Sequence, residues 1–312
     1  SAPDLFAALV ELREADADQT SRSDTTDLKA PEWEVFSGIT DVVDKENLLA
    51  RPEPAPDRFR SQMAAVLRLE RVREVQTIVG FTRVTPPDEE IEQDEYSAVV
   101  PLGSDTVDWL PASVVRGEGI LLRFDPDAVR QWMKRDAVKE RMQYLERGHR
   151  QYRTQRRALD ASAGFPGIVY AMLHTLSHLL VRELSIACGY NAASIRERIY
   201  ANDEPADGMA GILLYTASPD SDGTLGGLVD LGRANKLGPL LDGALQRAIA
   251  CSSDPLCSEH VADEDATLHN VACHSCVFVP ETSCEMSNRY LDRALVVPLP
   301  GMEHASFFEV RD

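Results

Sequence analysis

Residues 165–188, FPGIVYAMLHTLSHLLVRELSIAC, form the stretch of sequence that decides the core of this chain. Apolar side chains recur there at helical spacing, which predicts a buried helix at the centre of the fold. These apolar residues are Met172, Leu173, Leu176, Leu179, Leu180 and Leu184. Gly189 follows directly and is expected to end the helix, because glycine adopts the left-handed conformation of a C-terminal cap at little steric cost.

The composition is that of a globular protein with a substantial core. The 312 residues include 32 Lys and Arg against 51 Asp and Glu, a formal net charge of −19, and 44% of the residues are hydrophobic. This length and apolar content fit one large domain or two domains and exclude disorder of the whole chain. The negative charge disfavours coating by nucleic acid, so any DNA contact is expected to be local.

The sequence carries no signal for a membrane or for export. Its purely apolar runs fall far short of the roughly 20 residues that span a bilayer, and the chain does not open with a basic segment followed by an apolar run. We therefore expect a cytoplasmic protein without a membrane partner. The chain begins Ser1-Ala2-Pro3-Asp4 rather than with methionine, and we expect it to be processed or part of a longer protein.

The residues before the central helix are expected to form an arm and then a small β region. Residues 1–56 combine a short helical pattern with a polar stretch and a proline-rich end, which is typical of an arm or linker. Apolar residues in 57–75 lie largely at helical spacing, and Pro56 suits a helix start. Short β-rich runs follow at 78–84, 98–102, 107–110, 113–116 and 120–124. Gly117-Glu118-Gly119 separates the last two runs and is interpreted as a hairpin turn.

A long, basic helix is expected between the β region and the central helix. Asp125 followed by Pro126 is typical of an N-terminal cap and first turn, and the helical pattern runs to about Leu159. The candidate contact residues on this helix are Lys139, Arg147, Arg150, Arg153, Arg156 and Arg157. The helix either exposes a solvated face with internal ion pairs or binds phosphate groups or a protein partner.

Shorter elements are expected after the central helix. The patterns predict a helical turn at 195–200, a strand at 211–216 and a helix at 235–250. The last of these leads the chain directly to a group of cysteines near the carboxyl end.

The spacing of these cysteines is that of a metal site. Cys273 and Cys276 form a Cys-x2-Cys pair, in which one tight turn presents two thiolates to the same ion. Cys251 and Cys257 supply a second pair across a loop, and four thiolates complete a closed tetrahedral shell. In a chain without an export signal, such clustering indicates metal rather than disulfides. We therefore predict a structural Zn²⁺ held by these four cysteines.

The ligand set has alternatives at the level of sequence. Cys284 is the first substitute, because it lies near the start of an expected helix whose dipole favours a thiolate. His260, His269 and His274 are also close enough in sequence to replace a cysteine. The cysteines could instead be reduced core residues without a metal. Cys188, at the end of the central helix, is expected to be inert and part of the core.

No signature of an enzyme accompanies the cysteines. His174 and His178 lie four residues apart, but Thr175 stands where a zinc protease needs its glutamate. We interpret the two histidines as hydrogen-bonded core or interface residues. The segment 223–227 lacks the Gly-Lys-Ser/Thr ending of a phosphate-binding loop, and its glycines are interpreted as a tight passage from strand to helix. The sequence thus predicts no catalytic residue.

Several segments resemble the MrfA-type zinc-binding domain that accompanies superfamily 2 helicases. They are 174–180 (HTLSHLL), 211–215 (GILLY), 223–228 (GTLGGL) and the cysteine group that ends in Cys273-His274-Ser275-Cys276. The family has a proline where this chain has His274. Further segments are similar to the DrmB family of the DISARM anti-phage system, namely 69–75, 80–83, 107–111, 117–120, 272–276, 280–285 and 288–293.

The patterns and the resemblance together predict an α+β fold, in which a small mixed or antiparallel β region precedes a helix-rich C-terminal zinc-binding domain. We expect an N-terminal arm at 1–56, an α/β region ending in the basic helix at 57–160, and the MrfA-type domain at 161–312.

The resemblance implies a non-catalytic subunit that partners a DrmA-like helicase and assists its engagement of invading DNA. The basic helix is the candidate surface for that contact. A metal-dependent nuclease or hydrolase that uses the cysteine-bound ion with one of the nearby histidines is the alternative, and it requires an open coordination position. A scaffold that binds only proteins would lack salt-sensitive affinity for DNA.

Overall fold

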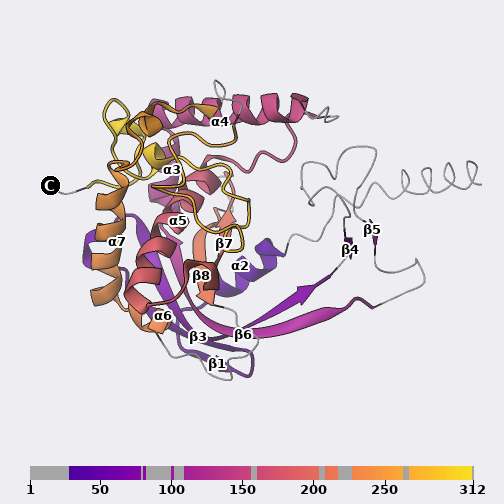
Figure 1. Cartoon of the computed structure of the whole chain (residues 1–312). Coiled ribbons are helices and arrows are strands. Elements are labelled where there is room, and N and C mark those ends of the chain that lie inside the picture. The colour runs from indigo at the N-terminus through magenta and orange to yellow at the C-terminus, as the bar shows by residue number, and fades with distance from the viewer. Residues whose placement is uncertain are drawn as a thin grey trace, which may run out of the picture. The chain divides into compact units, whose positions relative to one another are not determined.

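The computed structural model describes residues 28–78, 80–81, 100–101, 109–155, 160–203, 208–216, 227–262 and 267–310 (Figure 1). The chain divides into two compact units, Ser1–Gly38 and Ile39–Asp312. The described part of the first unit contains the helix α2 (Lys29–Ser37). The sheet and the candidate site belong to the second unit, which includes residues on both sides of the boundary expected near residue 160. The three-part division therefore stays a prediction.

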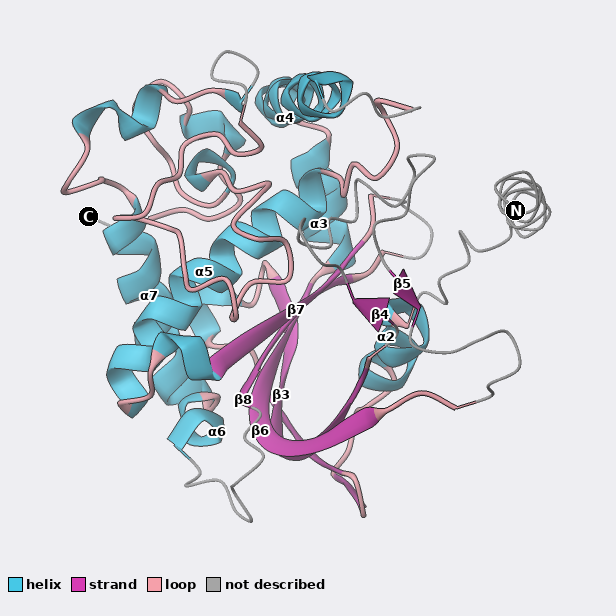
Figure 2. Ribbon diagram, turned by 45° about the vertical axis from the view of Figure 1, so that its right-hand side comes forward, coloured by secondary structure: helices cyan, strands magenta, loops and turns pink. Residues whose placement is uncertain are grey.

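Within the described residues, the main sheet has six strands, and every neighbouring pair is antiparallel. The strand order across the sheet is β1-β2-β3-β6-β8-β7. The strands are β1 (Val43–Lys45), β2 (Leu48–Glu53), β3 (Met63–Thr77), β6 (Ala112–Phe124), β7 (Ile195–Ala201) and β8 (Ala210–Thr216). A separate pair joins β4 (Gly80–Phe81) to β5 (Val100–Pro101). Within the second unit, helices gather on one side of this sheet (Figure 2), which confirms the predicted α+β class.

The prediction of a helix at 57–75 is wrong, because β3 occupies most of that range. A short 3-10 turn, η2 (Asp57–Phe59), precedes the strand. β3 pairs with β2 along one edge and with β6 along the other, so its backbone groups are satisfied by two neighbours. The leucine and valine spacing resembles a helical repeat, but long-range pairing outweighs local preference in such a segment.

β6 passes through Gly117-Glu118-Gly119 without turning, so the expected hairpin is also wrong. Gly117 lies opposite Val72 and Gly119 opposite Leu69, with a shift in register on β3 between these partners. A side chain at Gly119 would place its Cβ 2.8 Å from the carbonyl oxygen of Leu214 on β8. Glycine is therefore required there by the close approach of β8 and not by a turn.

Two further segments differ from expectation by joining the sheet. β1 and β2 lie within the range 1–56 that we assigned to an arm, and β7 replaces the helical turn expected at 195–200. The expected strand at 211–216 is confirmed as β8, and the expected helix at 235–250 is confirmed as α7 (Ala234–Ala248). Between them lies the short helix α6 (Gly227–Leu231).

The long helix expected from residue 125 consists of two helices. α3 (Pro126–Met133) begins as predicted, because the Asp125 carboxylate accepts a hydrogen bond of 2.8 Å from the backbone N–H of Ala128. The chain breaks near Lys134 and continues as α4 (Asp136–Gln155). The end of the expected helix at 156–159 lies outside the described residues.

The central helix is confirmed as α5 (Ile168–Cys188), and Gly189 caps it in the left-handed conformation with φ of 72°. Every residue of α5 from Ile168 to Val181 is buried. The Asp203 carboxylate accepts the backbone N–H groups of Ile168 at 2.8 Å and Val169 at 3.0 Å, which satisfies the first turn of α5. Among the described helices, none combines the length and the apolar character needed to cross a bilayer.

After α7 the described chain runs mostly in loops and short 3-10 turns, namely η4 (Pro255–Glu259), η5 (Arg293–Leu295) and η6 (Glu303–Ala305). These loops cover α5, and most of their buried apolar residues belong to the same hydrophobic cluster as those of α5. The helix expected to start near Cys284 is absent from the described residues 280–290, which form turns.

Candidate metal centre

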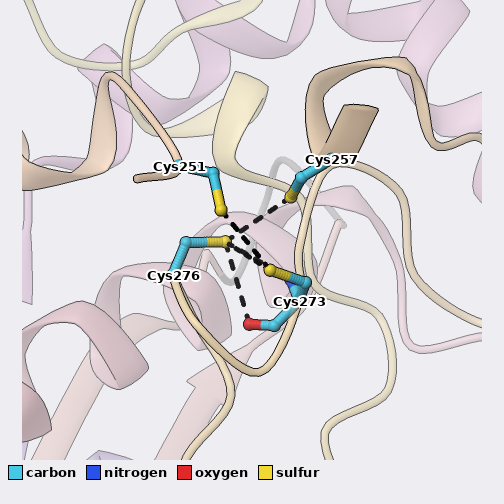
Figure 3. Close-up of side chains that lie close together, drawn as sticks. All are labelled: Cys251, Cys257, Cys273 and Cys276. Carbon is cyan, nitrogen blue, oxygen red and sulfur yellow. Dashed lines mark hydrogen bonds between the residues drawn. The ribbon is translucent and has the colours of Figure 1, made fainter. Parts of the chain in front are cut away.

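Four cysteine sulfur atoms converge at the carboxyl-terminal side of α7 (Figure 3). The sulfur of Cys251 lies 3.6 Å from that of Cys273, and the sulfur of Cys257 lies 3.6 Å from that of Cys276. Cys273 and Cys276 are separated by the same sulfur–sulfur distance of 3.6 Å. All four sulfur atoms lie within 4.8 Å of one another. The structure thus brings together the four cysteines that the spacing singled out.

The distances fit one tetrahedral ion. Four sulfur atoms at a Zn–S distance of about 2.3 Å stand about 3.8 Å apart at the corners of a tetrahedron. The observed 3.6 Å separations are close to this value, whereas a disulfide would require about 2.05 Å. All six cysteines of the chain are free. The donor set is therefore that of a closed site without a vertex for substrate.

Local backbone structure positions each pair. Cys251 follows the end of α7, and Cys257 lies in η4, where the Asp254 carboxylate accepts the backbone N–H of Leu256. In the second pair, the carbonyl oxygen of Cys273 accepts the backbone N–H groups of Cys276, Val277 and Phe278 at 3.2, 3.0 and 3.1 Å. This tight turn directs both thiols of the Cys-x2-Cys pair toward the same point (Figure 3).

The protonation of the thiols favours a cation among them. The hydrogen bond between the sulfur atoms of Cys257 and Cys276 lowers the pKa of Cys276 to about 5, against the opposing effect of burial. The same hydrogen bond, together with burial, raises the pKa of Cys257. One thiolate is thus stabilised only while its neighbour keeps a proton. A divalent ion replaces such protons and allows all four sulfur atoms to be thiolates.

Arg293 provides a fixed positive charge beside the cluster. Its side chain is 1% exposed and donates to the carbonyl oxygens of Ala248 at 2.8 Å and Val271 at 3.3 Å. The remaining guanidinium nitrogen, Nη2, lies 3.5 Å from the sulfur of Cys257. Four thiolates around Zn²⁺ carry a net charge of −2, which this guanidinium partly balances. The cysteine spacing gave no indication of this residue.

Comparison with known proteins agrees with this chemistry. Residues 176–277 match the sequence model of the family described as MrfA Zn-binding domain, and the matched range contains all four clustered cysteines. The chain is also 36% identical over 288 residues to the DISARM protein DrmB of Bacillus paralicheniformis. That similarity covers 90% of this chain and 49% of DrmB.

Residues 176–277 are thus similar to the MrfA Zn-binding domain, and most of the chain is similar to DrmB. It spans about half the length of the curated relative that it matches. The expectation of zinc as the cofactor is confirmed by the family match together with the four-cysteine cluster.

The histidines that we considered as substitute ligands lie beside the four-cysteine cluster. His260, His269 and His274 line a surface cavity of about 540 Å³ together with Cys257 and Cys273. The rings of His260 and His269 stack at 4.5 Å, and both rings also hydrogen-bond to neighbouring groups. The described part of the chain contains two groups of potential metal ligands, the four cysteines and a second group described below. None of these three histidines belongs to either group.

Cys284 and Cys188 both lie outside the four-sulfur cluster. Cys284 belongs to a second group of potential metal ligands with His174, His178 and Glu197. Sequence reasoning missed this group, because only the four-residue spacing of the histidines is visible locally. Cys188 donates a hydrogen bond of 2.8 Å to the carbonyl oxygen of Leu184, as expected for an inert thiol at the end of α5.

The candidate contact residues of the basic helix divide into three groups. Lys139, Arg147 and Arg150 are exposed on α4. Arg153 is 1% exposed and donates to the carbonyl oxygen of Asp160 at 2.9 Å, so burial removes it from the surface. The remaining candidates, Arg156 and Arg157, lie outside the described residues. We define Lys139, Arg147 and Arg150 as the basic face of α4.

Proposed function

We propose that this chain is a zinc-containing, non-catalytic subunit of a DISARM anti-phage defence system. In this proposal it partners a DrmA-like superfamily 2 helicase in the cytoplasm and assists the engagement of DNA. The observation that carries the proposal is the similarity to DrmB across nine-tenths of the chain, combined with the four-cysteine cluster.

A structural role for the zinc is supported by the composition of the cluster. We propose Cys251, Cys257, Cys273 and Cys276 as its ligands. Four thiolates fill a tetrahedral shell, so the ion has no position for a reacting water. Instead, the ion would tie the end of α7 to η4 and to the turn at 273–276, which are joined by loops with little helix or sheet.

The basic face of α4 supports the proposed contact with DNA or the helicase. Its three cations stand out in a chain whose formal net charge is −19. Lys139 forms an ion pair of 3.0 Å with Asp136, and the guanidinium of Arg147 lies 4.8 Å from the ring of Tyr144. Both contacts are local to α4, and the three side chains are exposed at the surface, where phosphate groups bind.

Co-purification tests the proposed partnership. A tagged form of the chain is expressed with its cognate DrmA-like helicase, and zinc is measured in the same eluted fraction. We expect the two proteins to elute together with zinc present. Separate elution of a folded, zinc-loaded chain from the helicase would contradict the proposal.

A second candidate function is favoured by the cavity that His260, His269 and His274 line beside Cys257 and Cys273. A metal-dependent nuclease or hydrolase would use one of these imidazoles with the cysteine-bound ion. It requires a water or an open position on that ion. X-ray absorption at the zinc edge of a Cys284→Ser variant, which keeps all four clustered cysteines, distinguishes the two candidate functions, because a shell of four sulfur atoms excludes the hydrolase.

A further inference from the structure

A second set of potential metal ligands lies inside the fold, away from the four cysteines. It consists of His174 and His178 on α5, Glu197 on β7 and Cys284 in the turns that follow the Cys-x2-Cys pair. One ligand atom from each residue lies within 4.8 Å of every other. The side chains of both histidines and of Glu197 are 0% exposed, and Cys284 is half-buried.

The two imidazoles point at the same pair of acceptors. Nε2 of His174 lies 2.9 Å from Oε1 of Glu197 and 3.1 Å from the sulfur of Cys284. Nε2 of His178 lies 3.4 Å from the same Oε1. Zinc binds imidazole nitrogen, carboxylate oxygen and thiolate sulfur at about 2.0 to 2.3 Å, so ligands around one tetrahedral ion stand about 3.3 to 3.8 Å apart. The observed separations need shifts of only a few tenths of an ångström to reach that range.

His178 is held in the orientation of a metal ligand. Its Nδ1–H donates to the carbonyl oxygen of Val277 at 3.2 Å, which directs the lone pair of Nε2 toward Glu197 and Cys284. Nε2 of His178 is buried and makes no hydrogen bond within the described part of the chain. A purely hydrogen-bonded core histidine satisfies both ring nitrogens, whereas a metal ligand leaves one for the ion.

The backbone around Cys284 presents its sulfur as an acceptor. The N–H groups of Met286 and Asn288 donate to this sulfur at 3.3 and 3.1 Å. The chain wraps around the sulfur by placing Ser287 and Asn288 in the left-handed region, with φ of 51° and 59°. The Asn288 side chain fixes this turn through two hydrogen bonds of 3.0 Å to the backbone of Val279. N–H donors directed at sulfur stabilise a thiolate, which is the form that binds metal.

Glu197 is oriented in the same way. The Ser177 hydroxyl donates to its Oε2, and the backbone N–H of Glu285 donates to its Oε1 at 3.2 Å. These bonds hold Oε1 between the two imidazoles while leaving it a further lone pair. Three of the four donors, those of His178, Glu197 and Cys284, are therefore positioned by hydrogen bonds from outside the set.

We propose that His174, His178, Glu197 and Cys284 bind a second Zn²⁺ ion, at a site distinct from the four-cysteine centre. Two nitrogens, one oxygen and one sulfur form a mixed set that suits zinc and supply one carboxylate and one thiolate to neutralise its charge. The four ligands complete a tetrahedral coordination shell. The ion therefore joins α5, β7 and the turn that contains Cys284, which we call the 284 turn. α5 also connects the two centres, because Arg182 donates to the carbonyl oxygen of Ser275 at 2.8 Å, inside the Cys-x2-Cys turn.

The test is the zinc content of the purified chain and of three single variants. Wild type is expected to hold about two zinc ions per chain after dialysis against metal-free buffer. Cys284→Ser and Cys257→Ser each remove one ligand from one centre, and each variant is expected to retain about one ion. Cys188→Ser, which alters a cysteine outside both sets, is the matched control and is expected to match wild type.

Zinc-edge X-ray absorption of the wild type covers the case in which a variant fails to fold. Two occupied centres give an average shell that contains sulfur together with nitrogen or oxygen neighbours. One zinc ion per chain in wild type with a shell of sulfur alone would overturn the second site. Unchanged zinc content in a folded Cys284→Ser variant would overturn it as well. In both cases the four-cysteine centre and the proposed function would stand.

Discussion

Nη2 of Arg293 lies 3.5 Å from the sulfur of Cys257, with the guanidinium fully inside the protein. The same side chain also donates hydrogen bonds to the carbonyl oxygens of Ala248, at the end of α7, and of Val271, in a loop. It therefore joins the metal centre to both segments. A buried charge without a partner is costly, and here the thiolates of the centre are its counter-charge. Metal binding and folding of the loops are thereby coupled through Arg293.

We predict that Arg293→Met weakens zinc binding at the four-cysteine centre by about 10- to 100-fold, the usual effect of losing a partner of a metal ligand. Arg293→Lys keeps the charge but loses the forked donors, and an intermediate loss is expected. Competition with a chromophoric zinc chelator measures both affinities. Wild-type affinity in a folded Arg293→Met variant would show that the guanidinium does not support the centre.

Removal of zinc is expected to destabilise the chain. A ligand present at about 1,000 times its dissociation constant stabilises the folded state by about 4 kcal/mol, and chelation removes that contribution. Cys273→Ser is expected to lower the free energy of unfolding in zinc-containing buffer and to abolish the part of the response to chelator that comes from the four-cysteine centre. Cys188→Ser, whose hydroxyl can keep the bond to Leu184, is expected to cost less than about 1 kcal/mol. Thermal unfolding with and without chelator distinguishes these outcomes.

Arg141 on α4 forms a buried ion pair with Asp292. The Arg141 Nε donates to Oδ2 of Asp292 at 2.7 Å, and Asn270 donates to the same oxygen at 2.9 Å. Arg141→Met leaves the carboxylate buried without its cation and is expected to cost about 3 to 5 kcal/mol in urea unfolding. The exposed Lys139→Met on the same helix is expected to cost no more than about 1 kcal/mol. Equal losses in the two variants would contradict this account of α4.

Gly119→Ala is expected to disturb the pairing of β6 with β8. The new Cβ would lie 2.8 Å from the Leu214 carbonyl oxygen and 2.9 Å from the Cβ of Tyr215, so the strands must separate. We expect a loss of about 1 to 3 kcal/mol, the usual range for overpacking. Gly208→Ala is the control, because the atom nearest to its new Cβ would be the Cβ of Pro126, at an ordinary van der Waals distance of 3.7 Å. Urea unfolding that ranks Gly208→Ala as the more harmful change would contradict the close approach at Gly119.

Charge reversal on the basic face of α4 tests the proposed contact with DNA. The double variant Arg147→Glu with Arg150→Glu is expected to weaken DNA binding by the helicase complex and to reduce the salt dependence by about one phosphate contact per arginine. Lys45→Glu with Arg60→Glu changes the net charge equally on exposed residues elsewhere. Binding is measured over a series of salt concentrations. Equal behaviour of the two double variants would remove α4 from the interface.

The elements that the sequence predicted are those whose partners are local. α5 is apolar on nearly all sides and ends at Gly189, and both features lie within one continuous stretch. The start of α3 at Asp125 and Pro126 is equally local. The Cys-x2-Cys pair at Cys273 and Cys276 is formed by a single turn, so its geometry also follows from neighbouring residues.

The elements that the sequence misassigned depend on distant partners. β3 has leucine and valine at spacings that suit a helix, and it becomes a strand because β2 and β6 lie on either side of it. Gly119 looks like a turn residue, and only the position of Leu214 shows that it is a point of close approach. Arg153 looks like part of a charged surface, and its burial depends on the loop at Asp160.

By itself, the sequence determined that the chain has an apolar central helix and a cluster of thiols suited to zinc, because both are recorded in short-range spacing. Only the tertiary structure decided that Cys284 lies with His174, His178 and Glu197 instead of with the four clustered cysteines. These residues are up to 110 positions apart along the chain, and they meet because β7 and the 284 turn both pack against α5. Local sequence patterns do not predict such contacts, because the side chains are brought together by the packing of separate elements. The propensity of a single element does not determine that packing.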